Sequence, residues 1–342
     1  MALVSLQKLY SYMISCLLKS GLNEEHAGWM AEVFQRATLR GVGHHDIASF
    51  PGRLKNLADG SLNSSPKFSL INQYAALENY EGDNAPGEVA SMFILQRAER
   101  LADQHGIGFC AIRHSNHFLA AAPYVEKAAE DGYIGILFTR GSPAMSAIGR
   151  KEKAISTCPM GFGFPTNLEY PVMMDFCLAY ASMGLLDEKI KAGESVPPYW
   201  GIDKNGNPTT DPLLLKEGTR APIGGHKGFG LSMLGEVFTG VLSGGEVIDE
   251  PNPITGKPNS ASQAVILIKA DGLMPMHQFK TRTTTMVERI EARAPGIHIP
   301  GAGSFEKKKA FLSENKIDLP QDLIEKLNLW AEKFQIPLLR ED

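Results

Sequence analysis

The feature that most constrains the fold is an alternation of strand-like and helix-like segments between residues 107 and 139. Residues 107–112 form a short apolar run typical of a buried strand, and residues 133–139, YIGILFT, form a second one. The segment between them, up to residue 131, follows a helical pattern. This order is typical of a crossover unit, so the sequence predicts an α/β fold whose sheet contains parallel pairing.

Helical patterns dominate both ends of the chain. Residues 4–19 and 23–38 place apolar side chains at helical spacing, with Gly21 as a stop and Asn23 as an N-cap. The other expected elements are an extended stretch at 68–81, a long helix after Pro86, short extended pieces at 154–157 and 172–176, a turn-dense excursion at 194–222, a strand at 264–269, and helices at 278–292, 304–315 and 320–335.

Composition excludes several classes of protein. The chain has 342 residues, 43% of them hydrophobic and 21% charged, which is long enough for a large core divided into two lobes. Its net charge of -4 argues against a nucleic-acid or anionic membrane partner. The four cysteines form no C-x-x-C pair, and no signal peptide or membrane-spanning run is present. We therefore expect a cytoplasmic enzyme that acts on a small molecule.

The two stretches best suited to catalysis both contain pairs of histidines. In IRHSNHFLAAAPY, His114 and His117 follow the predicted strand and precede the predicted helix, and His44 and His45 stand at a glycine break after the second helix. Loops just past strand ends often present reactive groups, and histidine exchanges protons near neutral pH. Helix capping is the alternative interpretation. No H-E-x-x-H motif or set of cysteine ligands supports a metal site.

Two glycine-rich turns open helices and are candidates for binding phosphate. GGHKGFG places His226 and Lys227 at a predicted helix start, where backbone N–H groups and the helix dipole favour an anion, although a plain glycine hinge is an alternative. Gly301, Ala302 and Gly303 form a second turn, for which simple capping is the alternative. The G-x-G string at residues 106–108 lies at the start of a strand and not after one, so a Rossmann fingerprint is absent.

Together these stretches match a known family. RGVGHHDIASFPGRL, RHSNHF, STCP, FGFP, TTDP, GGHKGFGLSM and PGAGSFEKKKAF occur here in the order typical of the non-Rossmann malate/L-lactate dehydrogenases. The chain resembles this family over essentially its whole length. The resemblance implies hydride transfer between NAD or NADP and a small 2-oxo acid of the malate, lactate or diketogulonate type, in a homodimer.

The resemblance also implies a division of the chain and a set of site residues. It places a helical N-terminal lobe at residues 1–75, a non-Rossmann, mixed-sheet NAD(P)-binding lobe at 76–303, and C-terminal helices that return to the first lobe at 304–342. His117 is the first candidate for the acid/base group and His45 the second, with His44 as a possible relay. The residues implied to contact the cofactor are Gly141, Ser142, Met174, Asp175, Phe176, His226, Lys227, Gly301, Ala302 and Gly303.

The departures from the family concern the substrate. The family's S-H-G segment is His44-His45-Asp46 here, and Ser49 stands where an arginine that binds carboxylate is usual. Arg53 lies four residues further on, and positions i and i+4 share one face of a helix. We therefore expect Arg53 to supply the missing guanidinium to a substrate carboxylate, the alternative being a solvated surface arginine.

Two other functions remain open from the sequence. GGHKG followed by LSM is similar to the branch of the family that reduces cyclic imino acids of the piperideine-2-carboxylate type. The altered S-H-G segment also allows a nucleotide-binding protein that has lost catalysis. The choice between NAD and NADP has no marker, because the acidic residue that follows a Rossmann fingerprint has no counterpart.

Overall fold

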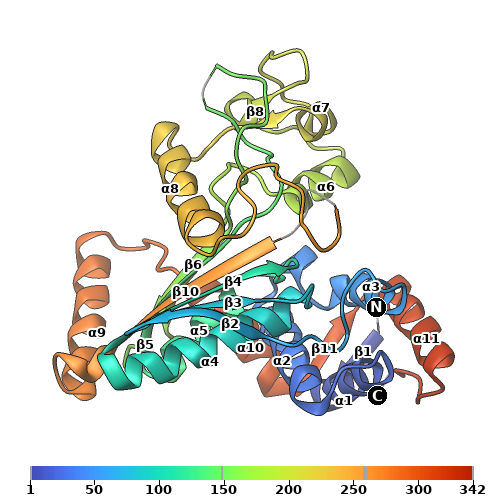
Figure 1. Ribbon diagram of the computed structural model, residues 1–342, viewed down its shortest axis with the longest axis horizontal. Helices are drawn as coiled ribbons and strands as arrows, with labels where there is room; N and C mark the ends of the chain where they lie inside the picture. The colour runs from blue at the N-terminus through green and yellow to red at the C-terminus, as the bar shows by residue number, and fades with distance from the viewer. Residues whose placement is uncertain (1, 148, 257–260, 341–342) are drawn as a thin grey trace.

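The computed structural model describes residues 2–147, 149–256 and 261–340 (Figure 1). The strands are β1 (Ala2–Ser5), β2 (Ser69–Tyr74), β3 (Leu77–Glu81), β4 (Ile107–Ser115), β5 (Tyr133–Thr139), β6 (Met160–Phe164), β7 (Val172–Phe176), β8 (Gly201–Ile202), β9 (Thr219–Arg220), β10 (Ala261–Lys269) and β11 (Lys316–Leu319). The α-helices are α1 (Leu6–Lys19), α2 (Glu24–Arg40), α3 (Phe50–Ala58), α4 (Gly87–His105), α5 (Ala122–Glu130), α6 (Met183–Ala192), α7 (Pro212–Glu217), α8 (His226–Glu236), α9 (Met276–Arg293), α10 (Ala302–Glu314) and α11 (Gln321–Phe334). Shorter turns of helix lie at η1 (Gly43–His45), η2 (Ile47–Ser49), η3 (Pro198–Trp200), η4 (Val237–Val241) and η5 (Ala270–Gly272).

A seven-stranded mixed sheet with the order β2-β3-β4-β10-β5-β6-β7 forms the centre of the molecule. The predicted α/β class, the non-Rossmann sheet and the presence of parallel pairing in it are confirmed. β4 and β5 run in the same direction, yet β10 lies between them and pairs antiparallel with both. Of the strands described, only β3 and β4 pair in parallel. The inserted strand comes from much later in the chain, so the local strand–helix–strand order could not reveal it.

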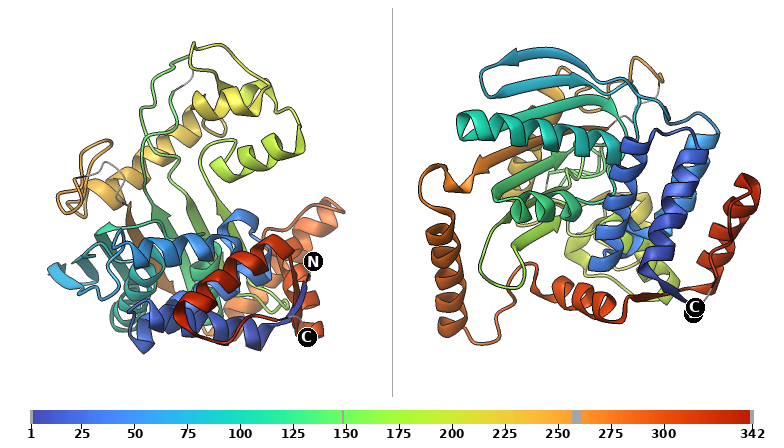
Figure 2. Two further views of the ribbon diagram at one scale, coloured as in Figure 1. Left: turned by 90° about the vertical axis from the view of Figure 1, so that its right-hand side faces the viewer. Right: turned by 90° about the horizontal axis from the view of Figure 1, so that it is seen from below.

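Helices α4 and α5 cover one face of the sheet, and α2 packs against them (Figures 1 and 2). Met92 and Leu95 of α4 and Val125 of α5 are buried there, as an apolar stripe on each helix requires. The opposite face meets α8 and η4. The elements from α6 to η4 form a lobe that projects from this face, which we call the projecting lobe (Figure 1).

The two ends of the chain lie together. Strand β1 pairs antiparallel with β11, and the hydroxyl of Tyr12 on α1 donates to the carbonyl of Leu327 on α11. Both termini appear on the same side in Figure 2. Helix α2 begins at the expected N-cap, because Asn23 Oδ1 accepts from the backbone N–H of His26 at 2.8 Å. The domain limits at residues 75 and 303 stay predictions.

Some local expectations need adjustment. Residues 154–157 contribute only an isolated bridge between Met145 and Ile155, and the 194–222 excursion contains η3, β8, α7 and β9.

Cys16, Cys110, Cys158 and Cys177 are free thiols, and the first three are buried. Within the described ranges, no helix is long and apolar enough to cross a membrane.

Candidate active site

A cavity of about 620 Å³ opens where the ends of β4, β5 and β7 meet the projecting lobe. Segments far apart in sequence contribute to it, and eight of the predicted site residues line it: His44, His45, His117, Gly141, Ser142, Met174, Asp175 and Phe176. Leu119, Pro159 and Ile223 add apolar surface. This size and mixture of an apolar wall with a few polar groups is typical of a site for a small molecule or cofactor.

His117 is held in a short loop after β4. Its Nδ1 atom accepts a hydrogen bond from the backbone N–H of Leu119 at 3.1 Å and lies 3.1 Å from Nη2 of Arg53. Leu119 has a φ of 77°, a left-handed value that is rare for leucine, and it holds the N–H that donates to this Nδ1 atom. By surface area His117 is exposed, and that surface faces the cavity. The surrounding protein, and then Arg53, His45 and His44, hold its pKa well below the ordinary value.

His45 lies against His117. Their rings are stacked with centroids 5.0 Å apart, and the His44 ring is 4.1 Å from that of His45. Burial, followed by the charges of His44 and Arg53, lowers the pKa of His45 to about 4. Both stacked rings are therefore neutral near pH 7 in the ligand-free protein.

His44 makes contact with the projecting lobe. Its Nδ1 atom is 3.5 Å from Oε1 of Glu188, and its Nε2 atom is 3.5 Å from Oγ of Ser182. A Cβ atom on Gly184 would come within 2.1 Å of the His44 ring, so glycine is required at this position of α6. The three histidines thus form one row from the β4 loop to α6.

Ser49 and Arg53 do not line the cavity. The Ser49 hydroxyl donates to the carbonyl of His44. Nε of Arg53 donates to Oε1 of Glu88 at 2.7 Å, and its Nη2 donates to the carbonyl of His117 at 3.0 Å. Arg53 is therefore neither a solvated surface residue nor a guanidinium open to the cavity. Glu88, fully buried on α4, is a contributor that no local pattern in the sequence indicated.

The predicted cofactor residues fall into three groups. Gly141 and Ser142 follow β5, and Met174 to Phe176 end β7, where the Asp175 carboxylate accepts from the backbone N–H of Ala122 at 3.1 Å. Burial raises the pKa of Asp175 to about 6. The second group is the start of α8 with His226 and Lys227, which borders a second cavity of about 460 Å³ through Gly225.

The third group is the turn formed by Gly301, Ala302 and Gly303, which lies at the other end of β7. The backbone N–H of Met173 donates to the carbonyl of Pro300 at 3.3 Å. Gly301 has a φ of 95°, and a Cβ there would stand 3.0 Å from the carbonyl oxygen of Pro171, which explains the glycine. The structure therefore sets this turn against the same edge strand as Met174 to Phe176 but outside the cavity.

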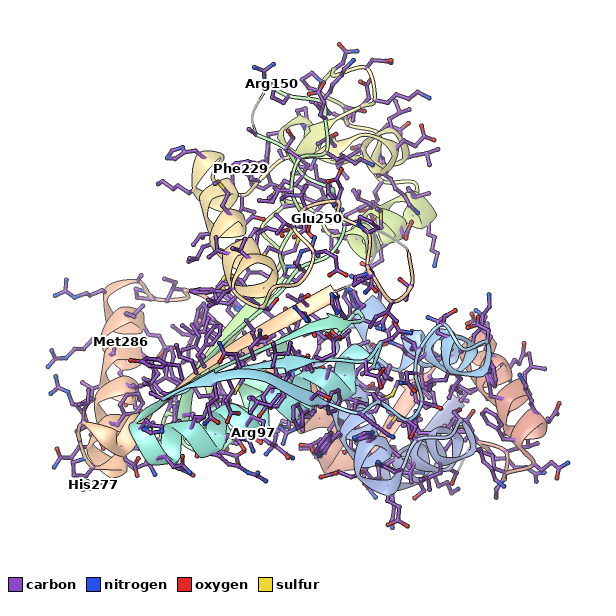
Figure 3. All side chains as sticks on the ribbon, in the orientation of Figure 1. Arg97, Arg150, Phe229, Glu250, His277 and Met286 are labelled. Carbon is purple, nitrogen blue, oxygen red and sulfur yellow. The ribbon has the colours of Figure 1, made fainter. Side chains whose placement is uncertain are left out.

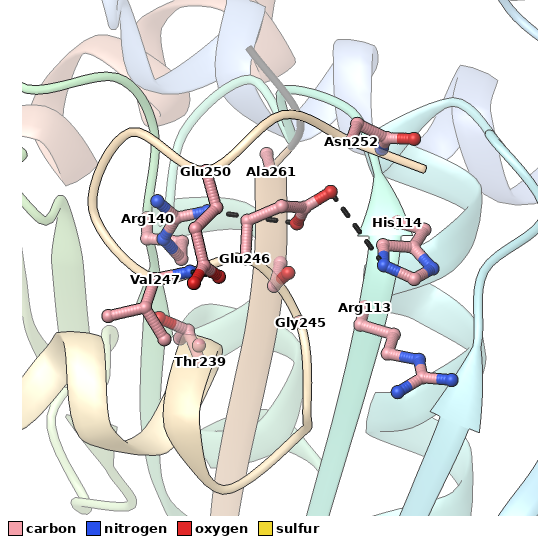
Figure 4. Close-up of polar contacts among 12 residues, drawn as sticks. Arg113, His114, Arg140, Thr239, Gly245, Glu246, Val247, Glu250, Asn252 and Ala261 are labelled. Atoms are coloured by element: carbon pink, nitrogen blue, oxygen red, sulfur yellow. Dashed lines mark hydrogen bonds and ion pairs between the residues drawn. The ribbon is translucent and has the colours of Figure 1, made fainter. Parts of the chain in front are cut away.

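A buried charged network supports the cavity from the sheet side (Figure 4). Arg140, next to Gly141, donates from Nε to Oε2 of Glu236 at 2.9 Å, and its Nη1 is 3.8 Å from Oε2 of Glu246. Oε1 of Glu246 lies 3.7 Å from Nε2 of His114, whose Nδ1 is 2.8 Å from Glu81. His114 thus holds the end of β4 and does not line the cavity, which the sequence left open.

The described residues contain no cluster of side chains suited to a metal ion. Across residues 2–147, 149–256 and 261–340, no three His, Cys, Asp or Glu side chains gather so that they could hold an ion. The chemistry available in the cavity is that of imidazole, hydroxyl, carboxyl and guanidinium groups beside an apolar wall.

Comparison with known proteins agrees with this geometry. A family model described as malate/L-lactate dehydrogenase matches residues 4–328. A malate/(S)-sulfolactate dehydrogenase of Methanothermus fervidus is 30% identical over 338 residues, covering 98% of this chain and 99% of that protein. A solved malate dehydrogenase of Entamoeba histolytica superposes with a TM-score of 0.91 at 25% identity, covering 98% of both chains.

A solved delta1-piperideine-2-carboxylate reductase of Pseudomonas syringae superposes with a TM-score of 0.88 at 25% identity, covering 97% of this chain and all of that one. The resemblance noted in the sequence is confirmed. The chain belongs to the malate/L-lactate dehydrogenase family, whose members are oxidoreductases that act on hydroxy acids with a nicotinamide cofactor.

Proposed function

We propose that the protein transfers a hydride between NAD or NADP and a small 2-hydroxy or 2-oxo acid, and that His45 exchanges the proton. The observation that carries this proposal is the row of histidine rings on one wall of a cavity whose other wall is apolar. Reduction of a carbonyl needs a proton donor at the oxygen and a dry surface for the nicotinamide, and the histidine row and the apolar wall suit these two roles.

The residues around the cavity fit a nicotinamide cofactor. Met174 and Phe176 offer apolar surface, and a Cβ at Gly141 would meet no atom within 4 Å, so this turn leaves room for a ligand. When bound, the cofactor supplies or accepts the hydride. We assign its nicotinamide end to these residues with Ser142 and Asp175, and its phosphates to His226, Lys227 and the turn from Gly301 to Gly303.

The hydrogen bonds favour His45 over His117 as the proton-exchanging group. A backbone N–H can only donate, so Nδ1 of His117 is an acceptor and the ring proton is on Nε2. Protonating Nδ1 would break that hydrogen bond and set a cation beside Arg53. No hydrogen bond of either ring nitrogen of His45 is found among the described residues, so both stay free to exchange a proton. This reverses the order suggested by the sequence.

His117 and Arg53 then serve the substrate carbonyl differently. The Nε2–H of His117 can donate a hydrogen bond to the carbonyl oxygen as negative charge develops there, which lowers the barrier without proton transfer. Arg53, oriented by Glu88, fixes the His117 ring and loop. A bound substrate carboxylate adds negative charge near His45 and raises its pKa from about 4 toward neutrality.

The function is tested by oxidation of reduced cofactor. The purified protein is mixed with NADH or NADPH and, in parallel, with oxaloacetate, pyruvate, 2,3-diketogulonate and a cyclic imine. We expect loss of absorbance of the reduced cofactor with at least one 2-oxo acid. Turnover of the imine alone would favour the second candidate, and turnover of no substrate would favour a protein that binds nucleotide without catalysis.

The second candidate, a reductase of cyclic imino acids, is supported by the structural similarity to the piperideine-2-carboxylate reductase. The same groups suit that reaction, because a protonated imidazole can donate a proton to the imine nitrogen, as it does to a carbonyl oxygen, while hydride adds to the carbon. The side-by-side assay separates the two by their values of kcat/KM.

We also propose that the protein is a homodimer in which α8 and η4 contribute to the interface. Six apolar side chains of this segment are between 41% and 56% exposed: Leu231, Met233, Leu234, Val237, Val241 and Leu242. An apolar patch of this kind marks an interaction surface. Light scattering is expected to give twice the chain mass, and Leu234→Glu to give a monomer. Leu273→Glu, on a residue that is 95% exposed outside this patch, is the control and leaves the mass unchanged. A wild-type monomer would contradict the proposal.

A further inference from the structure

Arg220 differs in its ion pairing from the other buried and half-buried arginines among the described residues. Six such arginines each have a carboxylate within 4.0 Å: Arg36, Arg40, Arg53, Arg97, Arg113 and Arg140. Arg220 is only 8% exposed, and the described part of the chain offers it no ion pair. Among residues that the structure describes, its guanidinium makes one hydrogen bond, from Nη1 to the carbonyl of Ala181 at 3.3 Å.

A buried guanidinium without a counter-ion is unfavourable. Removing it from water costs free energy that only a partner charge or several hydrogen bonds offset, and Arg220 has neither. Burial accordingly lowers the pKa of its side chain. Unpaired buried charges are found where function requires them, so the missing anion is expected to come from a ligand.

Arg220 stands where a ligand can reach it. It lines both the 620 Å³ cavity with the histidines and the adjoining 460 Å³ cavity, which share Tyr180 as well. Its strand, β9, is fixed at this place by backbone hydrogen bonds from Arg220 N–H to the carbonyl of Ala144 and from Ser146 N–H to the carbonyl of Arg220. The side chain therefore borders the reaction cavity from the projecting lobe, on a rigid element.

The other cationic candidates are already committed. Arg53 is bonded to Glu88 and His117, and Arg140 is bonded to Glu236 and to the carbonyl of Ile248. Ser49 has no charge. Two arginines line the cavity, Arg140 and Arg220. Of these, only Arg220 has a guanidinium without a carboxylate partner among the described residues, and the planar pair of N–H groups of a guanidinium suits a carboxylate.

We propose that Arg220 is the residue that binds the carboxylate of the 2-oxo acid, in place of the arginine absent at Ser49 and instead of Arg53. This inference rests on the proposed function. A nucleotide phosphate has the same fork-binding chemistry, so the experiment treats substrate and cofactor in separate arms.

The first arm measures steady-state kinetics and the second measures binding. Arg220→Met removes the charge at similar size, and Arg220→Lys keeps the charge without the fork. We expect Arg220→Met to raise KM for the 2-oxo acid by about 10- to 100-fold, with a smaller rise in Arg220→Lys. Guanidinium ions in solution should partly restore activity to Arg220→Met. Affinity for NADH and NADPH, followed by nucleotide fluorescence, should stay within about two-fold.

Binding is tested without turnover by the thermal stabilisation that oxalate, an inert dicarboxylate, gives to each protein. Oxalate should raise the Tm of the wild type and not that of Arg220→Met. The ligand-free variant should unfold at the same temperature as the wild type or a higher one, because it loses an unpaired buried charge. If Arg220 served only to stabilise the fold, Arg220→Met would have a lower Tm than the wild type.

Arg150→Met is the matched control. Arg150 is exposed, lines only the second of the two cavities and lies beside the outer end of the projecting lobe (Figure 3), so its loss should alter neither KM nor the oxalate effect. An equal effect in this control, or weaker cofactor binding with unchanged KM in Arg220→Met, would overturn the proposal. If the wild type reduces no substrate yet binds oxalate through Arg220, the proposed function fails and the anion site stands. If the wild type is active and Arg220→Met has an unchanged KM, the inference alone fails.

Discussion

His45→Asn is expected to lower kcat for reduction of the 2-oxo acid by about 10²- to 10⁴-fold, the range that a general acid contributes. The substitution removes the ring that can hold and release a proton, while KM and cofactor affinity change little. Steady-state kinetics, with the cofactor affinity measured separately by fluorescence, check this result. Retention of most of kcat would contradict the assignment of His45.

The pH dependence distinguishes His45 from His117. Reduction needs the protonated ring, so wild-type kcat/KM should rise as the pH falls from neutrality toward about 4, the pKa of His45 in the free protein. The corresponding rise in kcat should occur at higher pH, because kcat reports the substrate complex, in which the bound carboxylate raises the pKa of His45. Oxidation needs the neutral ring and should decline only on the acid side.

His117→Asn is the matched comparison, since both rings border the same cavity. It should lower kcat by about 10²-fold through loss of the hydrogen bond to the developing oxyanion, yet keep the same pH limb. His45→Asn should abolish the limb. If His117→Asn abolished it instead, the order originally favoured by the sequence would be restored.

Arg40→Met is expected to lower the free energy of unfolding by about 3–5 kcal/mol, the cost of breaking one side of a buried ion pair. Arg40 and Glu126 are 2% and 0% exposed, and Nε of Arg40 donates to Oε1 of Glu126 at 2.9 Å. Nη1 of Arg40 also donates to the carbonyl of Gly301 at 3.1 Å, so the pair joins α2 and α5 to the turn before α10. Urea denaturation followed by circular dichroism measures the change.

Two further variants make this result specific. Lys309→Met breaks an exposed pair with Glu169 and should leave stability unchanged, because solvent screens such pairs. Glu126→Gln added to Arg40→Met should recover part of the loss, because it removes the charge left without its main partner. A loss below about 1 kcal/mol in Arg40→Met would show that Lys308 and Arg36, 2.6 Å and 3.5 Å from the Glu126 carboxylate, are sufficient partners without Arg40.

The acid limb of stability should depend on the same pair. Burial raises the pKa of Glu126, but Arg40 and Lys308 outweigh burial and hold that pKa below its usual value. A carboxylate with a lowered pKa in the folded state stabilises above its unfolded pKa and loses this contribution as the pH falls through the folded value. Arg40→Met should therefore reduce the difference in stability between neutral and acid pH.

Local patterns were sufficient for most elements of secondary structure. Helices α1, α2 and α4 and strand β10 follow from apolar spacing, glycine stops and the Asn23 cap, because these signals act within a few residues of one another. The pairing of β4 with β10 depends on a strand from the far end of the sequence, and local periodicity carries no information about it.

For the candidate site too, local sequence indicated some features and only packing decided others. Short stretches such as RHSNHF, GHHD and GGHKG mark loops that hold reactive side chains, and eight predicted residues line one cavity. The sequence did not show that Arg53 pairs with Glu88 or that Arg220 has no ion pair among the described residues. The partner of an arginine comes from whatever element packs against it. Composition shows which charges exist, whereas packing determines which of them are paired.

By itself, the sequence determined the fold class, the family and the loops that carry the histidines, because each depends on patterns within single segments. Only the tertiary structure decided that β10 separates β4 from β5, that the His117 ring accepts at Nδ1, and that Arg220, one of two arginines lining the cavity, has no ion pair among the described residues. These facts concern distances between segments remote in sequence, and such distances arise only when the chain closes its loops around a common core.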